Sequence, residues 1–393
     1  MITLWNFFGR LGLTTRTDTA AEAEEKSIAS QLFRLPPEII SLITSMLPTP
    51  SVACLALCNR RMYHILGPES WKSFKSEAPD VLLAFLSLLA KDLPEHFVCQ
   101  ECTCIHRISV IKWPRIIKHR LGPPCTRNSL GYSLLFYSRF RIYFSHIQLA
   151  IRQHLHGTDI GFPLEAFRVV EVEHDQYKQK IALLSVDAQI VSNELLMRSQ
   201  TWILLPRSQQ DEFIDKLAKD SFSTELCIHA RLGPRDENLV SNLVRSRLDQ
   251  REAREKCPTQ TLQCLYCWMD FVLDVKDFGE RGLAVVITRW VNLGAGLDIE
   301  DAKWKSHTTT RMDRGVHHPH HPGDIRKAFE DQERLSLEEF TADIQLQLFS
   351  RRKVRLIYRG SDGLVWKWDQ YKRWYLAPSG PPEMSFWEFL RSP

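Results

Sequence analysis

The amino-acid sequence predicts an α+β fold, with a short helical region followed by a mixed body of helices and antiparallel β-hairpins. Three observations lead to this prediction. Residues 33–66 carry apolar side chains at helical spacing, divided by prolines. Residues 167–293 contain runs rich in valine, isoleucine and leucine, separated by polar turns, which is typical of strands. Cysteines and histidines cluster within the body, so zinc is a candidate stabiliser of this part of the fold.

The helical region should contain three short helices. The first should be started by the segment that contains Phe33, Leu35, Pro36, Pro37 and Glu38. Pro37 in its first turn loses no hydrogen bond, and Glu38 suits the positive end of the helix dipole. A second helix follows an expected cap at Thr49. A third segment, 61–66, should stop at Gly67. Such short helices cannot bury all their apolar side chains among themselves, so part of this surface should meet a partner or the rest of the chain.

These helices resemble a known docking motif. Leu35, Pro36, Glu38 and Ile39 open the pattern, spaced Ile and Leu positions continue it, and a basic and aromatic third segment closes it. Over residues 33–70 this arrangement is similar to the F-box, which docks a substrate receptor onto the Skp-type adaptor of cullin-based SCF ubiquitin ligases. An amphipathic helical hairpin that belongs to a larger core is the alternative interpretation.

The F-box resemblance implies a protein that binds other proteins and catalyses no reaction itself. A Skp-type adaptor and a cullin ligase would be its partners, and the body would hold an unknown protein substrate for ubiquitination. The residues expected to contact the adaptor are Leu35, Pro36, Pro37, Ile39, Ile43, Leu47 and Leu55. Two alternatives stay open: an F-box scaffold that acts outside a ligase, and a metal-dependent or redox enzyme whose N-terminal helices are merely structural.

Length and charge exclude several classes of protein. The 393 residues suffice for a leader at 1–30, expected to be disordered, an F-box at 31–75 and a mixed body at 76–393. The net charge of +4 is too small to indicate nucleic-acid binding. The longest apolar run, 81–90, is half the length of a bilayer span, so no membrane segment is expected. Ten cysteines without an export signal predict reduced thiols in the cytoplasm or nucleus.

The body should alternate between helices and strands. Two helices are expected within 69–92, and the stretch 129–156 looks helical at least from Phe144 and stops at Gly157. Strands are expected at 167–172, 181–190 and 194–205, and helices follow at 209–220 and 236–255. A strand pair is expected at 263–275 and 283–293, then a loop at 300–322 with a solvated histidine-rich run at 317–321. A helix from Asp324 into the 340s and a closing hairpin of 354–358 and 365–375 complete the expected body.

Several motifs of the body occur together in one known group of proteins. They are Asp92-Leu93-Pro94 with Phe97, Cys99, Cys102 and His106, then the segment 145–150, Cys227-Ile228-His229, Cys264 with Cys267, and Thr288-Arg289-Trp290 to Gly294. In this combination the chain resembles F-box proteins that are common in filamentous fungi. The similarity covers nearly the whole chain after residue 33, and it implies a ligase role without naming a substrate.

One group of residues has the chemistry of a structural zinc site. Cys227 and His229 stand two positions apart, so on an extended strand both point to the same side. Cys264 and Cys267 form a Cys-x-x-Cys pair, which can aim two sulfurs at one ion. Four protein ligands would leave no open position, so the zinc would contribute folding energy and no catalysis. Buried, inert thiols beside a satisfied histidine are the alternative.

A second group of possible ligands lies earlier in the body. Cys99, Cys102, Cys104, His106 and Cys125 offer five candidates for four positions. Of these, Cys99, Cys102, His106 and Cys125 form the most natural ligand set for a second zinc ion. Local packing of apolar cysteines and a redox pair are the alternatives, although a redox pair would lack its usual βαβ context.

Overall fold

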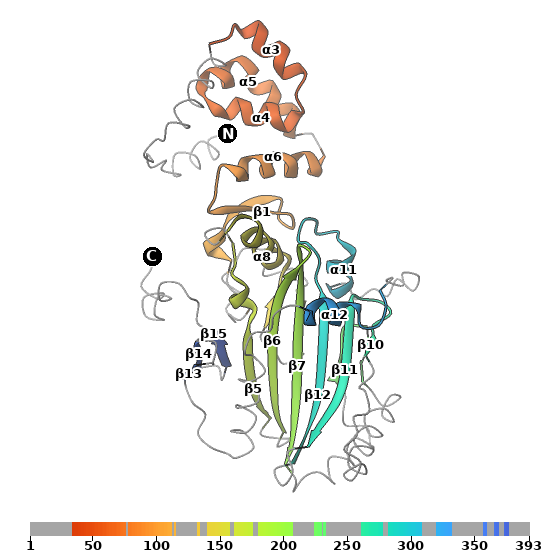
Figure 1. Cartoon of the computed structure of the whole chain (residues 1–393). Helices are drawn as coiled ribbons and strands as arrows, with labels where there is room; N and C mark the ends of the chain where they lie inside the picture. The colour runs from red at the N-terminus through yellow and green to blue at the C-terminus, as the bar shows by residue number, and fades with distance from the viewer. Residues whose placement is uncertain are drawn as a thin grey trace. The chain divides into compact units, whose positions relative to one another are not determined.

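The computed structural model divides into two compact units, Met1–Leu93 and Pro94–Pro393. It describes residues 34–75, 78–111, 114, 132–133, 140–157, 161–175, 180–206, 224–229, 231–232, 261–277, 282–308, 320–331, 357–359, 365–368 and 373–376. Helices form the described part of the first unit and antiparallel sheets dominate that of the second (Figure 1). The predicted α+β class is therefore confirmed. The expected leader at 1–30 lies outside the described residues.

The first unit shows four helices in its described part: α3 (Pro37–Ser45), α4 (Thr49–Cys58), α5 (Arg60–Lys75) and α6 (Pro79–Lys91). Helices α3, α4 and α6 each carry a proline in the first turn, where its missing N–H leaves no hydrogen bond unmade. Helix α3 begins at Pro37, within the segment that was predicted to start it. The predicted cap at Thr49 is wrong by one residue, because Pro48 holds the cap position and Thr49 is already helical.

The predicted end of the third helix at Gly67 is a kink within α5. Gly67 adopts φ 67° and ψ 169°, and the chain on its far side is helical again as far as Lys75. A positive φ costs glycine little because it has no Cβ. At the other end of α5, the Asn59 side chain accepts a hydrogen bond of 2.8 Å from the backbone N–H of Met62. Asn59 thus caps the helix and fixes where it starts.

A small core joins α4 and α6 in the first unit. Ala53 on α4 and Phe85 on α6 are buried together, with half-buried aliphatic side chains of the same two helices around them. Helix α3 buries only Ile40 and Thr44. Its start is tied to α5 by Arg61, whose guanidinium donates a hydrogen bond of 2.9 Å to the backbone oxygen of Leu35. Most of α3 is therefore left at the surface of the unit.

The second unit is built on an antiparallel sheet with nine described strands, in the order β10-β11-β12-β7-β6-β5-β15-β14-β13. Strands β6 and β7 are joined by Ser192 and Asn193, which both have positive φ, as a tight hairpin turn requires. The strands are β5 (Val169–Asp175), β6 (Lys180–Val191), β7 (Glu194–Pro206), β10 (Leu262–Gln263), β11 (Met269–Asp277), β12 (Gly282–Asn292), β13 (Ile357–Arg359), β14 (Val365–Trp368) and β15 (Arg373–Leu376).

Smaller elements surround this sheet. Within the described ranges, three two-stranded sheets pair β1 with β2, β3 with β4 and β8 with β9. Their bounds, with those of the helices, are β1 (His96–Cys99), β2 (Cys104–Arg107), η1 (Ile108–Val110), β3 (Tyr132–Ser133), β4 (Arg141–Ile142), α8 (Phe144–His156), η3 (Leu164–Phe167), β8 (Thr224–Glu225), β9 (Arg231–Leu232), α11 (Ala302–Thr308) and α12 (Asp324–Glu330).

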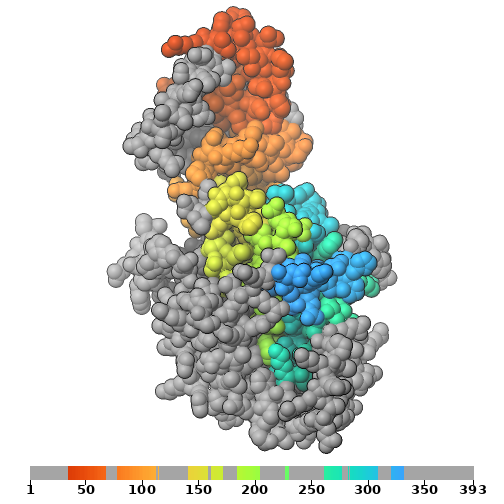
Figure 2. Space-filling view, viewed as in Figure 1, coloured from red at the N-terminus to blue at the C-terminus, as the bar shows by residue number. Residues whose placement is uncertain are grey.

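The two faces of the central strands carry different cores. On β12, Val285, Ile287 and Val291 belong to a large core that also contains buried side chains of α8. Trp290, on the opposite face of the same strand, packs with Ile325 of α12 in a smaller core. Helix α12 is visible on the outside of the unit in Figure 2. The sheet is thus buried on both faces where β11, β12 and β7 lie.

The strands predicted at 181–190, 194–205 and 283–293 are confirmed, and so is the helix that starts at Phe144 and ends before Gly157. The strand predicted at 167–172 is also present, but it starts at Val169 because Phe167 ends η3. The expected helices at 209–220 and 236–255 lie outside the described residues. The expected strand at 263–275 is interrupted at 264–268 by a turn. In that turn the backbone N–H of Cys264 donates to the Met269 oxygen at 3.0 Å, which closes the chain on itself.

Other predictions near the C-terminus are wrong in detail. The expected loop at 300–322 contains α11, which Asp301 caps by accepting a hydrogen bond of 2.9 Å from the Lys303 N–H. Helix α12 begins at Asp324 as predicted but ends at Glu330. Within the histidine-rich run, His320 is buried instead of solvated, and its ring stacks on Trp268. The segment predicted to form a separate closing hairpin instead contributes three strands, β13, β14 and β15. These strands belong to the main sheet, because β15 pairs with β5.

Candidate metal centre and docking surface

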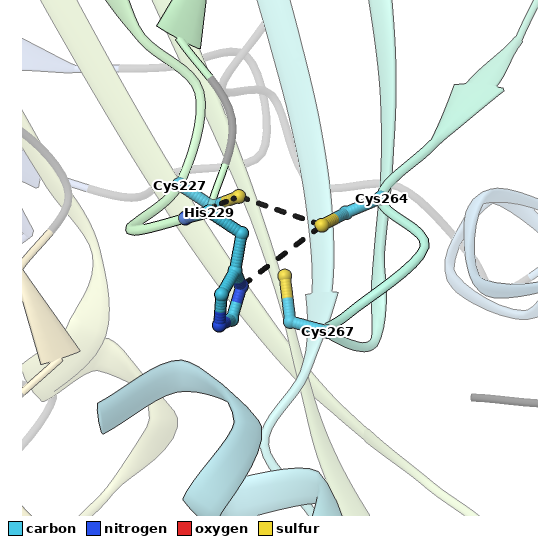
Figure 3. A group of neighbouring side chains, drawn as sticks. All are labelled: Cys227, His229, Cys264 and Cys267. Carbon is cyan, nitrogen blue, oxygen red and sulfur yellow. Dashed lines mark hydrogen bonds between the residues drawn. The ribbon is translucent and has the colours of Figure 1, made fainter. Parts of the chain in front are cut away.

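Two turns of the second unit bring four potential metal ligands together (Figure 3). Cys227 and His229 lie in the turn between β8 and β9, and Cys264 and Cys267 lie in the turn between β10 and β11. Both turns are local in sequence, whereas the contact between them is not. The sequence predicted this ligand set, and the structure brings all four residues to one place.

The distances between the ligand atoms suit a single ion. One atom from each residue lies within 4.8 Å of the others. The sulfur atoms of Cys227 and Cys264 are 3.6 Å apart, and the Cys264 sulfur is 4.0 Å from Nδ1 of His229. A tetrahedral zinc ion with bonds of about 2.0–2.3 Å places its ligand atoms roughly 3.3–3.8 Å apart. The four residues could therefore hold a metal ion with little rearrangement.

Backbone amides point at the sulfur atoms on both sides of the group. The N–H of His229 donates to the Cys227 sulfur at 3.4 Å, and the N–H of Tyr266 donates to the Cys264 sulfur at 3.4 Å. Hydrogen bonds of this kind stabilise negative charge on sulfur and orient the ligand. The two turns are therefore folded to present thiolates, which are the form that binds metal.

The three thiols of the group differ in the direction in which their pKa values are shifted. A hydrogen bond from Cys227 lowers the pKa of Cys264. Donating that hydrogen bond raises the pKa of Cys227, and bonds to its two sulfur neighbours raise the pKa of Cys267. At neutral pH, Cys227 and Cys267 are therefore expected to hold protons that a metal ion must displace.

The four ligands would fill the coordination sphere of a tetrahedral ion. Cys264 and Cys267 are buried, and Cys227 and His229 are half-buried. The ring of His229 also lies against that of Tyr266, with centroids 5.8 Å apart, which helps to fix its orientation. A site closed by four protein ligands offers no position for a substrate, so its chemistry is structural.

The second predicted group is only partly assembled by the described residues. Cys99, Cys102 and His106 offer ligand atoms within 4.8 Å of one another on the β1–β2 hairpin. Cys125, the predicted fourth ligand, lies outside the described residues. Cys104 is close, with its sulfur 3.4 Å from Nε2 of His106, but it is not a member of the mutually close group. Three ligand residues of one possible metal site are thus in place.

The residues expected to contact an adaptor are all accessible to some degree. Pro36, Pro37, Ile39 and Leu47 are exposed, and the remaining three, Leu35, Ile43 and Leu55, are half-buried. The most exposed apolar side chains of this region are Met46 and Leu42, at 81% and 62%. The expected contact set omitted both residues. Their helical spacing with Ile39 was the signal that could have included them.

Comparisons with protein-family models, with curated proteins and with solved structures give no match to this chain. Among the described residues, no helix is both long enough and apolar enough to span a membrane.

Proposed function

We propose that this chain is a docking protein of the F-box type. Its first unit binds a Skp-type adaptor through the apolar surface around α3. Its second unit, stabilised by zinc, binds a protein substrate that the ligase ubiquitinates. The chain itself makes and breaks no bond in this scheme. It contributes proximity, because it brings the substrate close to the ubiquitin-conjugating enzyme.

The observation that carries the proposal is the apolar surface of α3 and the turn after it. Ile39, Leu42, Met46 and Leu47 are all exposed, while Ile40 turns inward and is buried. Single exposed apolar side chains are normal, but a group of four on one short segment is typical of a surface that binds another protein. The segment is also the one whose sequence resembles the F-box, so sequence and exposure support the same use.

Zinc at Cys227, His229, Cys264 and Cys267 would serve the second unit as a crosslink. The ligands come from two turns that are separated by 37 positions between Cys227 and Cys264. One of these turns directly precedes β11, a nine-residue strand of the large sheet. Binding of a structural ion adds its free energy to folding, because the unfolded chain holds no preformed site.

Co-purification tests the docking function. The full chain is co-expressed with a Skp-type adaptor as wild type, as Leu42→Glu/Met46→Glu and as Leu297→Glu. Leu297 is a matched control because its side chain is 72% exposed in the second unit. We expect the double variant to capture at least tenfold less adaptor, and the control to capture as much as the wild type. Equal capture by the double variant and the control would contradict the proposal.

A metal-dependent enzyme is the second candidate, and the β1–β2 hairpin favours it. Cys99, Cys102 and His106 form a three-residue group among the described residues, and an ion held by these three ligands without Cys125 would keep a position open for water or substrate. Cobalt substitution separates the two candidates. A cobalt spectrum that responds to added azide or cyanide indicates an open position, whereas an unresponsive spectrum indicates a closed, structural site.

A further inference from the structure

Two cysteine sulfur atoms from different turns are in direct contact. The sulfur atoms of Cys227 and Cys264 are 3.6 Å apart, and neither residue is in a disulfide bond. In Figure 3 the two sulfur atoms point toward each other. A disulfide bond holds its sulfur atoms about 2.05 Å apart, so a movement of about 1.5 Å between the turns would let the bond form.

The sulfur pair is not sealed from solvent. Cys227 is half-buried, whereas Cys264 is 4% exposed and Cys267 is fully buried. A small oxidant can therefore reach the pair from the side of Cys227. Cysteines that sense oxidants are commonly accessible and have a second cysteine next to them, which completes the disulfide. Cys227 and Cys264 have this arrangement.

We infer that Cys227 and Cys264 form a redox-sensitive switch, in which a peroxide joins the two residues by a disulfide bond. One thiol takes an oxygen atom from hydrogen peroxide and becomes a sulfenic acid, and the rest of the peroxide leaves as water. The other thiol attacks that sulfur, the S–O bond breaks, and the oxygen leaves as a second water. Two thiols are thus oxidised to one disulfide while one peroxide is reduced to two waters.

The pairing of Cys227 with Cys264 has a larger structural effect than a bond within the Cys-x-x-Cys pair. Cys264 and Cys267 lie in one turn, which the Cys264 N–H already closes by donating to the Met269 oxygen at 3.0 Å. A bond between Cys227 and Cys264 instead spans 37 positions and ties two separate turns together. A crosslink that closes a longer loop restricts the unfolded chain more.

The disulfide bond and a metal ion compete for the same sulfur atoms. Metal binds the thiolate form, which a disulfide no longer offers. Oxidation would leave only His229 and Cys267 as ligands, too few for a closed tetrahedral site. A zinc ion held by the group would therefore be released. The bond needs only the two thiols, so the switch goes beyond the proposed docking function and does not depend on it.

Peptide mapping of the full chain tests the switch. The chain is reduced, freed of reductant, treated with a small excess of hydrogen peroxide, alkylated and digested with trypsin. Cys227 lies in the tryptic peptide 220–231, and Cys264 and Cys267 lie in the peptide 257–276. We expect a disulfide-linked pair of these peptides, in which fragmentation assigns the second sulfur to Cys264. Dithiothreitol should reverse the link, and a zinc indicator should record one ion released per link in a zinc-loaded chain.

Two variants sharpen this test. Cys227→Ser should lose the link between the peptides. Cys58→Ser is the matched control, because Cys58 is exposed and lies at the end of α4 in the first unit. The control should give the same yield of the link as the wild type. A lower yield would show that the link forms by exchange through Cys58 and would contradict the direct reaction.

The outcomes separate the switch from the metal centre. A wild-type chain that forms no link, or that joins Cys264 to Cys267, overturns the switch. A link between Cys227 and Cys264 in a chain that binds no zinc supports the switch and contradicts the metal centre. A chain that binds zinc and keeps both thiols in peroxide supports the metal centre and overturns the switch.

Discussion

The sulfur atoms of Cys227 and Cys264 lie 3.6 Å apart, across 37 positions of the sequence. No described β-strand pairing joins the turns that hold them, since β8 pairs with β9 and β10 pairs with β11. Thiolates in such close contact repel each other unless a proton or a metal ion lies between them. The group therefore crosslinks the two turns, and the strength of this crosslink depends on whether a proton or a metal ion lies between the sulfur atoms.

Removal of the metal should destabilise the second unit. With free zinc at about a thousand times its Kd, the bound ion stabilises the folded state by about 4 kcal/mol. We therefore expect a strong chelator to lower the thermal midpoint of the β-rich unit, and Cys264→Ser to do the same without chelator. Differential scanning calorimetry measures both. Cys58→Ser, an exposed cysteine at the end of α4, should leave the transition unchanged. A thermal midpoint that does not change when chelator is added would argue against a structural ion.

Acidity should weaken metal binding in a predictable way. The pKa of Cys227 and that of Cys267 are raised, whereas that of Cys264 is lowered, so two thiols must lose protons when metal binds. Lower pH favours those protons, so affinity falls as pH falls. Two displaced protons correspond to about a hundredfold change in affinity per pH unit near neutrality. Calorimetry in buffers of different ionisation enthalpy counts the protons. Three released protons would show that Cys264 is also protonated beforehand.

The hairpin group allows a test of its fourth ligand. The sequence predicts Cys125, and Cys104 lies outside the group whose ligand atoms are all within 4.8 Å of one another. In a chain whose first site is removed by Cys227→Ser/Cys264→Ser, we expect Cys125→Ser to reduce the sulfur-to-cobalt absorption band and Cys104→Ser to leave it intact. The reverse pattern would assign the position to Cys104. No band at all would leave the hairpin without a metal ion.

The contact between Asp270 and α12 should hold that helix on the sheet. Asp270 is fully buried on β11, and its Oδ2 accepts hydrogen bonds from the N–H groups of Ile325 at 2.9 Å and Arg326 at 3.0 Å. Loss of a helix cap costs about 0.5–2 kcal/mol. Asp270→Ala should therefore speed amide exchange in α12, measured by hydrogen-exchange mass spectrometry. Asp324→Ala, which removes an exposed carboxylate from the same helix, should have a much smaller effect. Equal protection in both variants would contradict this role.

Local patterns predicted the elements whose cause is local. The prolines at the starts of α3, α4 and α6 and the alternating strands β6 and β7 could be read from neighbouring residues. The kink at Gly67 could not, because a glycine followed by a proline permits both an end and a restart of a helix. Local sequence signals also do not show whether a histidine-rich run is buried by other parts of the fold. His320 is buried because Trp268 and Asp270 lie beside it, which only the folded sheet determines.

The candidate site likewise has features that the sequence predicted and features that it did not. The spacing of Cys227, His229, Cys264 and Cys267 is a chemical signal, and it was sufficient to predict the group. The buried Arg289 on β12, which donates a hydrogen bond to the residue before Cys227, gave no such signal, because one arginine within an apolar strand does not reveal which turn its side chain reaches. Its hydrogen bonds to Thr201 and Leu226 join residues 88 and 63 positions away. Contacts of that range need the register of the sheet.

The most direct test of the account is a calorimetric titration of the full chain with a purified Skp-type adaptor. We predict saturable binding at a 1:1 ratio. Leu42→Glu/Met46→Glu should weaken it by at least about a hundredfold, because two apolar anchors are replaced by charges, and an effect of about 3 kcal/mol is expected for such central contacts. Leu297→Glu should bind like the wild type. No binding by the wild type, or equal affinity for the double variant, would contradict the central claim that the apolar surface of α3 docks another protein.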